Sequence, residues 1–303
     1  MMKQLVVLSG KGGTGKTSVA AALAVLASRE RKIVLADADV DAANLAILLD
    51  PIEEERVDFV SPETAAIDPE RCVACGLCAE ACRFDAIPVE DSVYRVDPLG
   101  CEGCRACLWV CPEDAIRMER EPAGFRLRSR TPYGLLHHAH LFPGAENSGK
   151  LVSEVRREAR RSALDGGADF ILIDGPPGIG CPVIAASTGV DLALLVAEPT
   201  VSAIHDLARV RGAAEHFDVP CAIVVNKWDL NPGKTAEIER FAARDGLEIW
   251  GRIPYDREVP RTLVMRRPIT ECPAEGVRKA IAEIWEAARR AMDDAGDPFP
   301  TRG

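Results

Sequence analysis

Eight of the eleven cysteines fall between residues 72 and 111, and their spacing limits the fold of that stretch more than any other feature of the sequence. They form two runs of the pattern C-x2-C-x2-C-x3-C, and the second run lies 29 residues after the first. The same offset carries Asp85-Ala-Ile87 onto Asp114-Ala-Ile116, so the hydrophobic context repeats together with the cysteines. We conclude that the spacing is not accidental and that this stretch forms a cysteine-rich module.

Zinc sites and disulfides are the alternatives to an iron–sulfur module. A tetrahedral zinc ion takes four ligands, so two C-x2-C pairs would leave the third and fourth thiols of each run idle. Disulfides are expected in secreted chains, whereas metal-bound thiolates must stay deprotonated and reduced. Zinc and disulfides are therefore disfavoured, and we expect a cytoplasmic location.

The segment resembles the two-cluster bacterial ferredoxins, in which this run ligates 4Fe–4S clusters. The resemblance implies crossed ligation, in which the last cysteine of each run binds the cluster of the other run. The implied ligand sets are Cys72, Cys75, Cys78 and Cys111 for one cluster, and Cys82, Cys101, Cys104 and Cys107 for the other. One position departs from the family pattern: Pro112 follows Cys111 as expected, but Arg83 follows Cys82 and places a cation beside one cluster.

A glycine-rich segment near the N-terminus is the second strong feature. An apolar run of strand length, residues 4–9, leads into Gly10-Lys-Gly-Gly-Thr-Gly-Lys-Thr17 and then into an alanine-rich helical stretch. This is the context of a P-loop, whose backbone N–H groups and helix N-terminus surround phosphates. Lys16 would reach the β- and γ-phosphates, and Thr17 would bind Mg²⁺. The expected nucleotide-binding residues of this segment are Gly10, Lys11, Gly12, Gly13, Thr14, Gly15, Lys16, Thr17 and Ser18.

The second lysine of the loop, Lys11, makes it resemble the deviant Walker A loop of the MinD/ParA family, which includes the nitrogenase iron protein and the Mrp-type iron–sulfur carriers. The resemblance implies that Lys11 reaches the partner's nucleotide across an ATP-dependent homodimer. It also implies a doubly wound, mostly parallel α/β sheet of the P-loop NTPase type, here with a small α+β ferredoxin-like domain inserted.

Three carboxylates stand where that family places its Mg²⁺ and water ligands. An apolar strand, residues 33–36, ends in Asp37-Ala-Asp39, and a second one, residues 170–173, ends in Asp174. The resemblance makes Asp39 the group that orients the attacking water, and it assigns Asp37 and Asp174 to the Mg²⁺ shell. Gly178 would contact the γ-phosphate through its N–H. The catalytic set implied is Lys11, Lys16 and Asp39.

The identity of the base rests on two later segments. Residues 226–229 read N-K-W-D, a spelling that also occurs in GTPases, so guanine is one candidate. The deviant loop and the segment around Pro254 instead resemble MinD-type ATPases, in which Asn226 would recognise the base and Pro254 would cover adenine. We favour ATP.

The order of elements along the 303 residues predicts an interrupted ATPase. Residues 1–61 would form its first part, residues 66–121 the inserted ferredoxin-like domain, and residues 122–303 its second part. Apolar strands alternate with helical stretches in the second part, which favours a parallel sheet covered by helices on both faces. The apolar spacing of residues 277–292 predicts a helix packed on the sheet rather than a membrane-binding helix.

The net charge of −10 argues against nucleic-acid binding and against anionic membranes. No signal peptide is expected, because the first residues lead directly into a core strand, and we expect no stable membrane anchor. His137, His138 and His140 invite a metal site, but hydrogen-bonded strand histidines are the simpler interpretation. Cys181 follows the glycine loop and would meet its copy in a symmetric dimer, although a buried thiol is the simpler reading.

Three functions fit these features. The first is ATP-gated electron transfer to an unidentified protein partner, and the second is assembly or delivery of iron–sulfur clusters. The third is spatial organisation in the manner of MinD or ParA, with clusters as structural or sensing elements. We favour the first, because a carrier needs a labile cluster and the chain has no C-x2-C pair outside residues 72–111.

Overall fold

The computed structural model describes residues 2–60, 63–90, 93–98, 100–143, 145 and 148–293. Its contacts divide the chain into two compact units, each described by itself below. We call the first the sheet unit: Met1–Arg56, Arg126–His140 and Ser148–Gly303. We call the second the cysteine module: Val57–Phe125 and Leu141–Asn147. The expected first boundary at residue 61 and the tail after residue 293 lie outside the described residues.

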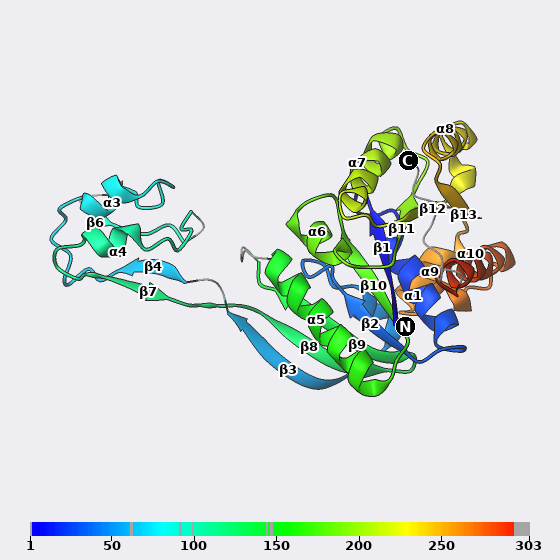
Figure 1. Ribbon diagram of the computed structural model, residues 1–303, viewed down its shortest axis with the longest axis horizontal. Coiled ribbons are helices and arrows are strands. Elements are labelled where there is room, and N and C mark those ends of the chain that lie inside the picture. Colours follow the sequence, from blue (N-terminus) through cyan, green and yellow to red (C-terminus); the bar gives the residue numbers. More distant parts are fainter. Residues whose placement is uncertain are drawn as a thin grey trace. The chain divides into compact units, whose positions relative to one another are not determined.

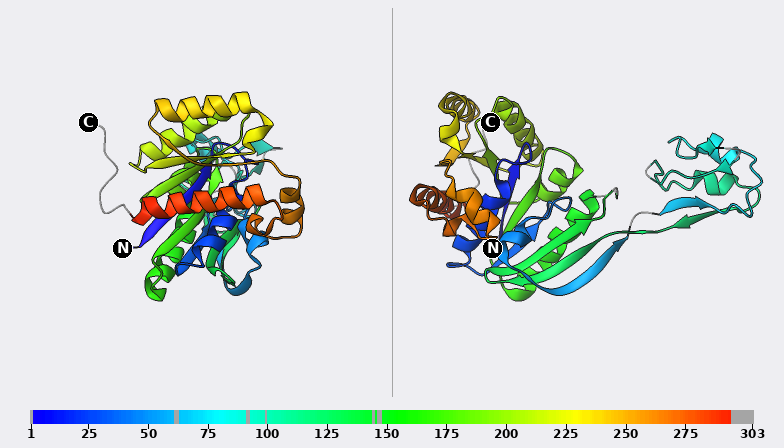
Figure 2. Two further views of the ribbon diagram at one scale, coloured as in Figure 1. Left: turned by 90° about the vertical axis from the view of Figure 1, so that its right-hand side faces the viewer. Right: turned by 180° about the vertical axis from the view of Figure 1, so that it is seen from behind.

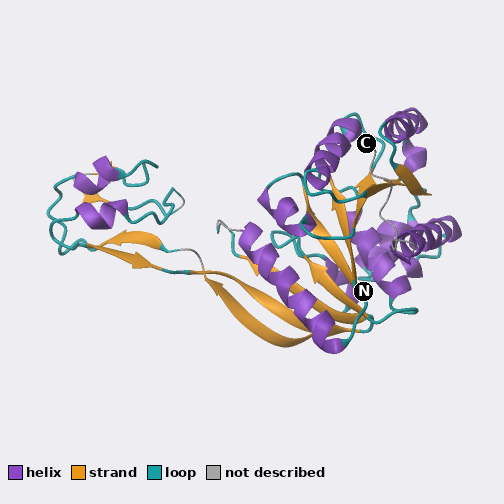
Figure 3. Ribbon diagram, viewed as in Figure 1, coloured by secondary structure: helices purple, strands orange, loops and turns teal. Residues whose placement is uncertain are grey.

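A nine-stranded sheet organises the sheet unit (Figures 1 and 3). Its strands are β1 (Lys3–Ser9), β2 (Ile33–Asp37), β3 (Ile52–Val60), β8 (Pro122–Thr131), β9 (Gly134–Leu141), β10 (Phe170–Pro177), β11 (Leu192–Ala197), β12 (Cys221–Asn226) and β13 (Glu248–Ile253). Their order is β13-β12-β11-β1-β10-β2-β9-β8-β3, and every pair from β13 to β9 is parallel. A two-residue turn joins β8 to β9, so these neighbours run antiparallel. The predicted mixed, mostly parallel α/β sheet is confirmed.

Helices cover both faces of this sheet, as Figure 2 also shows. On one face lie α1 (Lys16–Ala27), α2 (Leu45–Leu49), α9 (Glu258–Val264) and α10 (Glu275–Asp293). On the other lie α5 (Ser148–Gly166), α6 (Cys181–Ser187), α7 (Ala203–Glu215) and α8 (Pro232–Arg244). Because both faces are covered, central strands such as β11 are buried at every position. Helix α10 buries Val277, Ile281 and Trp285 and contacts β13 and α1, which confirms the predicted packing of the last helix.

No strand is predicted from the sequence at β3, which contains the acidic run Glu53-Glu-Glu55, or at β8, which begins with Pro122-Ala-Gly124. The acidic run is nonetheless a strand, because Glu54 and Glu55 form ion pairs with Arg128 and Arg130 of the neighbouring β8. Opposite charges on adjacent strands stabilise a sheet edge that has few apolar contacts to offer. The pattern of alternating apolar residues, which predicts a half-buried strand, is therefore absent from the acidic run of β3.

The cysteine module consists of short elements: β4 (Thr64–Ile67), α3 (Leu77–Ala81), β5 (Val89–Glu90), β6 (Val93–Tyr94), α4 (Ala106–Val110) and β7 (Ile116–Glu119). Strand β4 pairs antiparallel with β7, and β5 pairs antiparallel with β6. Ala65 faces Met118 in the first pair, and Tyr94 faces Val89 in the second. Tyr94 lies 29 residues after Ala65, and Met118 lies 29 residues after Val89, so the two pairs occupy equivalent positions. The sequence repeat is therefore also a structural repeat.

Candidate functional site

The P-loop connects β1 to α1 and is shaped by its glycines. Gly15 has a left-handed backbone with φ of 92°, and a Cβ there would lie 2.3 Å from Asn226 Nδ2. Asn226 Nδ2 donates a hydrogen bond to the Thr14 carbonyl over 2.7 Å. The side chain expected to recognise the base therefore fastens the loop through its amide nitrogen. Only glycine at position 15 permits both the turn and this approach.

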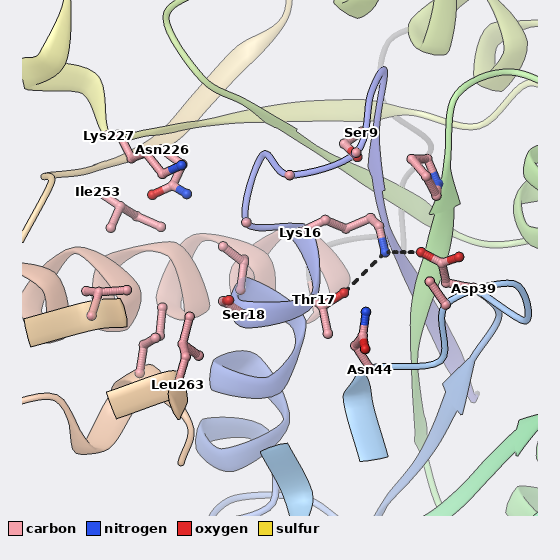
Figure 4. Close-up of a pocket in the computed structure, with 18 of the residues that line it drawn as sticks. Ser9, Lys16, Thr17, Ser18, Asp39, Asn44, Asn226, Lys227, Ile253 and Leu263 are labelled. Atoms are coloured by element: carbon pink, nitrogen blue, oxygen red, sulfur yellow. Dashed lines mark hydrogen bonds and ion pairs between the residues drawn. The ribbon is translucent and has the colours of Figure 1, made fainter. Parts of the chain in front are cut away.

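A cavity of ≈ 670 Å³ lies at this loop (Figure 4). The predicted residues that line it are Gly12, Gly13, Gly15, Lys16, Thr17, Ser18, Asp39, Asn226 and Pro254. The predicted residues outside its lining are Gly10, Lys11, Thr14, Asp37, Asp174 and Gly178. The volume and the loop at one end suit a ligand of nucleotide size.

Lys16 is the centre of the charged end of the cavity. Its Nζ lies 2.7 Å from Asp174 Oδ1, 3.5 Å from Asp39 Oδ2 and 3.4 Å from Thr17 Oγ1. Figure 4 shows Lys16 pointing toward Asp39 and Thr17. Burial opposes the ammonium charge, but the neighbouring carboxylates, Asp174 first among them, outweigh burial and raise the pKa of Lys16. The lysine therefore stays charged at neutral pH.

The carboxylates of Asp37, Asp39 and Asp174 carry more negative charge than the one ammonium group beside them can balance. Asp37 stands next to Asp174 in the sheet register, and its oxygens accept hydrogen bonds from the N–H groups of Asp39 and Leu45. Burial and the charge of Asp174 raise the pKa of Asp37 well above its ordinary value. Burial also raises the pKa of Asp39, and Lys16 offsets only part of that.

This excess of negative charge fits a divalent cation. Asp174 is fully buried, and its Oδ2 has no hydrogen-bond partner among the described residues. An unpartnered buried carboxylate oxygen is costly unless a cation binds it. The Thr17 hydroxyl, within 3.4 Å of the same ammonium, completes an oxygen-rich donor set of the kind that Mg²⁺ takes. These residues fit the Mg²⁺ that accompanies a nucleotide.

Lys11 is bound within its own chain. Its Nζ donates to Thr200 Oγ1 over 3.0 Å and forms an ion pair with Glu198 Oε1 at 3.2 Å. Glu198 also pairs with Lys227, at 3.2 Å. A carboxylate that pairs with two lysines stabilises each ion pair less than a carboxylate that pairs with one. The predicted reach of Lys11 to a second subunit therefore requires exchange of an in-chain contact.

The glycine loop after β10 is tied to the P-loop. Gly178 has φ of 90°, and its N–H donates to the Ser9 carbonyl over 2.9 Å. Ser9 Oγ in turn donates to the Lys11 carbonyl over 2.8 Å. For Gly178 to contact a γ-phosphate, its bond to Ser9 must open, so phosphate binding and movement of this loop are linked.

The apolar end of the cavity comes from segments that carry no motif. Val259, Pro260 and Leu263 of α9 and Ile269 beyond it line the cavity, and sequence reasoning missed all four. Their only signal is an apolar spacing within a short helix, which is indistinguishable from ordinary core. Ile253 and Leu263 are labelled in Figure 4 on the side of the loop away from Asp39. This wall suits the flat face of a base.

Asp229, the last residue of N-K-W-D, does not line the cavity. Its Oδ1 accepts a hydrogen bond from the N–H of Tyr255 over 2.7 Å. Tyr255 and its neighbour Pro254 both line the cavity. Asp229 thus holds the loop over the apolar end, and the residue that would bind guanine in a GTPase has a different task here.

The cysteine module is built from two interlocked halves. The N–H of Asp68 donates to the Ala115 carbonyl, and the N–H of Asp97, 29 residues later, donates to the Ala86 carbonyl, both over 2.8 Å. Each half thus bonds to the opposite half in the same way. Left-handed residues repeat as well: Ala74 with Gly103, Gly76 with Arg105, and Asp85 with Asp114.

The cysteines occupy equivalent positions in the two halves. None of the eleven cysteines, all of which the structure describes, forms a disulfide; Cys78 and Cys107 are buried, whereas Cys75 and Cys104 are exposed. Burial raises the pKa of the Cys78 and Cys107 thiols. Buried thiolates therefore need a cation, and metal ligation supplies one.

The surroundings of two cysteine sulfurs suit thiolates that bind a metal. In the described part of the chain, no group of three or more His, Cys, Asp or Glu side chains is arranged to hold a metal ion. Backbone N–H groups of Ala65 and Ala115 point to the sulfurs of Cys101 and Cys111, at 3.4 and 3.3 Å. Such bonds stabilise sulfur that carries negative charge.

The remaining candidates have ordinary surroundings. His137 Nε2 lies 2.9 Å from Ser162 Oγ, and His138 Nε2 lies 2.9 Å from Ser129 Oγ. Burial lowers the pKa of each ring to about 4, so both are neutral hydrogen-bonded strand residues. Cys181 is exposed at the start of α6, so the expectation of a buried thiol there is wrong.

Comparison with known proteins identifies the family. The sequence matches the family model of the CobQ/CobB/MinD/ParA nucleotide binding domain over residues 5–269. The chain therefore belongs to this family and is a nucleotide-binding ATPase of the MinD/ParA type.

An uncharacterized protein of Methanocaldococcus jannaschii is 32% identical over 286 residues, which cover 94% of this chain and 96% of that protein. An iron–sulfur cluster carrier protein of Pyrococcus abyssi is 25% identical and covers 93% of this chain and 84% of the carrier. The septum site-determining protein MinD of Pyrococcus horikoshii, solved with Mg-ADP, superposes with a TM-score of 0.62 at 19% identity, over 99% of this chain and 100% of MinD. At that identity the likeness shows the fold alone.

In the part of the chain that the structure describes, no helix has the length and apolar character needed to cross a membrane.

Proposed function

We propose that this ATPase is a MgATP-dependent dimeric switch that carries two 4Fe–4S clusters and gates electron transfer to a protein partner. The observation that carries the proposal is the exchange of equivalent backbone bonds, Asp68 to Ala115 and Asp97 to Ala86, between the two halves of the module. This mutual exchange between the halves supports crossed ligation, in which the last cysteine of each run would bind the cluster of the other run. When bound, the clusters supply one-electron redox chemistry.

The proposed ligands are those of the crossed pattern within a ferredoxin-like insertion of residues 66–121. Cys72, Cys75, Cys78 and Cys111 would hold one cluster, and Cys82, Cys101, Cys104 and Cys107 the other. All eight thiols are thereby used, which leaves no labile position and favours permanent redox groups. The ATPase would comprise residues 1–61 and 122–303.

Nucleotide binding would rearrange the charges at Lys16. A γ-phosphate attracts Lys16 away from Asp174 and Asp39, and it leaves Asp174 with Thr17 to hold Mg²⁺. Asp39 is then free to orient a water for attack, which is chiefly a matter of position and charge. Gly178 would give up its bond to Ser9, and Lys11 its bond to Glu198, so that a second subunit can be engaged.

ATP is the proposed nucleotide. The bond between Asp229 and the Tyr255 N–H and the apolar wall at Pro254 support adenine, because guanine recognition needs a free carboxylate in the base pocket. Titration with MgATP and MgGTP tests this, and we expect ATP to bind at least about tenfold more tightly. Equal affinity would refute the preference.

A second candidate is delivery of clusters, which the name of the Pyrococcus abyssi relative favours. The two candidates differ in the fate of the iron. Incubation with an apo-ferredoxin and MgATP would move iron out of a carrier, whereas an electron-transfer protein would keep it.

Iron analysis tests the main proposal. Anaerobically purified protein should contain about eight irons per chain and show a broad visible absorbance that dithionite bleaches. Stoichiometric zinc without iron would overturn the cluster assignment.

A further inference from the structure

Two packed helices of the cysteine module carry large apolar side chains in water. Trp109 of α4 is 81% exposed, although it lies between two of the cysteines, Cys107 and Cys111. Val110 beside it is exposed, as is Leu77 at the start of α3. Helices α3 and α4 pack against each other (Figure 1), so these side chains belong to one helix pair. We call it the α3–α4 face.

The repeat shows that the fold does not need this tryptophan. The residue equivalent to Trp109 in the first half is Glu80, 29 positions earlier on α3. Glu80 is exposed too, and α3 and α4 have the same length and the same backbone around them. A position that accepts glutamate in one half has no structural demand for an indole in the other. An exposed tryptophan of this kind is typical of an anchor that is buried by a partner.

The charge of the module specifies the partner. Residues 57–125 contain fourteen Asp and Glu and six Arg, so this stretch accounts for −8 of the chain's formal charge of −10. Three of the arginines are already engaged by the module's own glutamates: Arg105 and Arg120 by Glu63, and Arg117 by Glu119.

Exposed acids belong to the same helix pair or directly follow it. Glu80 lies on α3, and Glu113 and Asp114 follow Cys111 at the end of α4. Among the described residues none of these three has an ion pair on the module. The cluster thiolates add further negative charge. A basic protein surface therefore has the charge that complements this acidic face and would be attracted to it.

We propose that the α3–α4 face is the docking surface for a basic protein that accepts electrons, with Trp109 as its anchor. The inference rests on the proposed function. In the docked complex a reduced cluster loses one electron, and the acceptor's redox centre, a ferric haem in the test below, gains it. No proton or bond changes hands.

Cytochrome c and its succinylated form are matched probes, because succinylation turns basic lysines into acids on the same protein. Calorimetric titration of the oxidised protein with oxidised cytochrome c measures docking without any electron transfer. We expect binding that weakens with salt and is lost with the succinylated form. Trp109→Ala should weaken it about tenfold, and Glu80→Lys should reduce its salt dependence. Matched controls are Val89→Ala, an exposed apolar residue of the module, and Glu53→Lys, an exposed acid of β3.

Stopped-flow reduction then separates docking from redox competence. Dithionite-reduced protein should reduce cytochrome c more slowly after Trp109→Ala, while reduction of the small acceptor hexaammineruthenium(III) stays unchanged. Unaltered affinity of Trp109→Ala for cytochrome c, or equal binding of the succinylated form, would overturn the docking surface. Failure to reduce hexaammineruthenium would instead refute the redox function, and the titration would still decide the docking.

Discussion

The two units of this protein differ in what stabilises the fold of each. In the sheet unit, a buried apolar core extends from β1 and α1 through the central strands to α10. Among the described residues, the main hydrophobic cluster of the module has five buried members, and two of them are cysteines: Ala65, Cys78, Ile87, Cys107 and Ile116. A core that small recovers little of the conformational entropy lost on folding, so small domains of this kind depend on metals or disulfides. We therefore expect the sheet unit to be stabilised by packing, and the module by the clusters that its cysteines are proposed to bind.

The largest effect is therefore expected from removal of iron, which should destabilise the module and not the sheet unit. Chelation of the reduced protein, or the double change Cys78→Ser and Cys107→Ser, should unfold the module and leave the sheet unit folded. Hydrogen exchange measures this: amides of α3 and α4 should lose at least about a hundredfold of protection, and those of β1 and β10 should keep theirs. A module that stays protected without iron would mean that its apolar core suffices.

Loss of Lys16 should have the next largest effect, confined to the sheet unit. Lys16→Ala removes the partner of the phosphates, so MgATP affinity should fall at least about a hundredfold by calorimetry. It also leaves Asp174 without its cation, so the sheet unit should melt earlier while iron content stays the same. Lys16→Arg is the matched control, because it keeps the charge. A loss of iron in Lys16→Ala alone would show that the units are not independent.

A smaller effect is expected from Lys11, which makes only in-chain contacts here. Lys11→Ala should leave nucleotide affinity within about threefold but lower ATP-dependent dimerisation and turnover at least about tenfold. Sedimentation velocity with and without MgATP measures the dimer. Lys227→Ala is the control, because Lys227 pairs with the same Glu198 at the same distance. If both variants dimerise normally, the proposed reach of Lys11 is wrong.

The smallest effect concerns acid. His137 and His138 belong to the sheet unit and have pKa values of about 4, below the ordinary 6.5. The unfolded chain therefore binds their protons first, and stability falls as the pH drops from 6.5 toward 4. One pH unit below 6.5 the loss is about 1 kcal/mol for each ring. Hydrogen exchange in β9 as a function of pH measures it, and His137→Gln should flatten the slope. An unchanged slope would mean that His137 is not buried neutral.

The features that could be predicted from the sequence are those fixed by local chemistry. The P-loop needs glycine where φ is positive and lysine where phosphate charge falls, so residues 10–18 reveal it directly. Asp39 and Asp174 follow apolar strands, and parallel strands bring their ends together. The repeat of the cysteines likewise appears in the sequence because each half needs the same four thiols.

The features that could not be predicted depend on contacts between distant segments. Strand β3 forms because Glu54 meets Arg130 of β8, and neither residue reveals the other in the sequence. The resemblance assigns Asn226 to the base and Asn226 lines the cavity, but nothing in the sequence indicates the bond from its amide nitrogen to the Thr14 carbonyl. Asp229 fits the spelling of a GTPase motif, but in the fold its carboxylate accepts a hydrogen bond from the Tyr255 N–H. Motifs predict residue types at a site, but partners within the fold decide their tasks.

The strand order also determines which segments can fold first while the chain is being synthesised. Strand β1 has β10 and β11 as its neighbours, so the first strand made has no partner until the ribosome has passed residue 177. The residues whose backbone bonds interlock the module all lie within residues 64–119 and are made much earlier. Chains emerge slowly relative to local folding, and segments with nearby partners fold first. All eight cysteines of the module are therefore available to bind iron while the strands that pair with β1 have not yet been made.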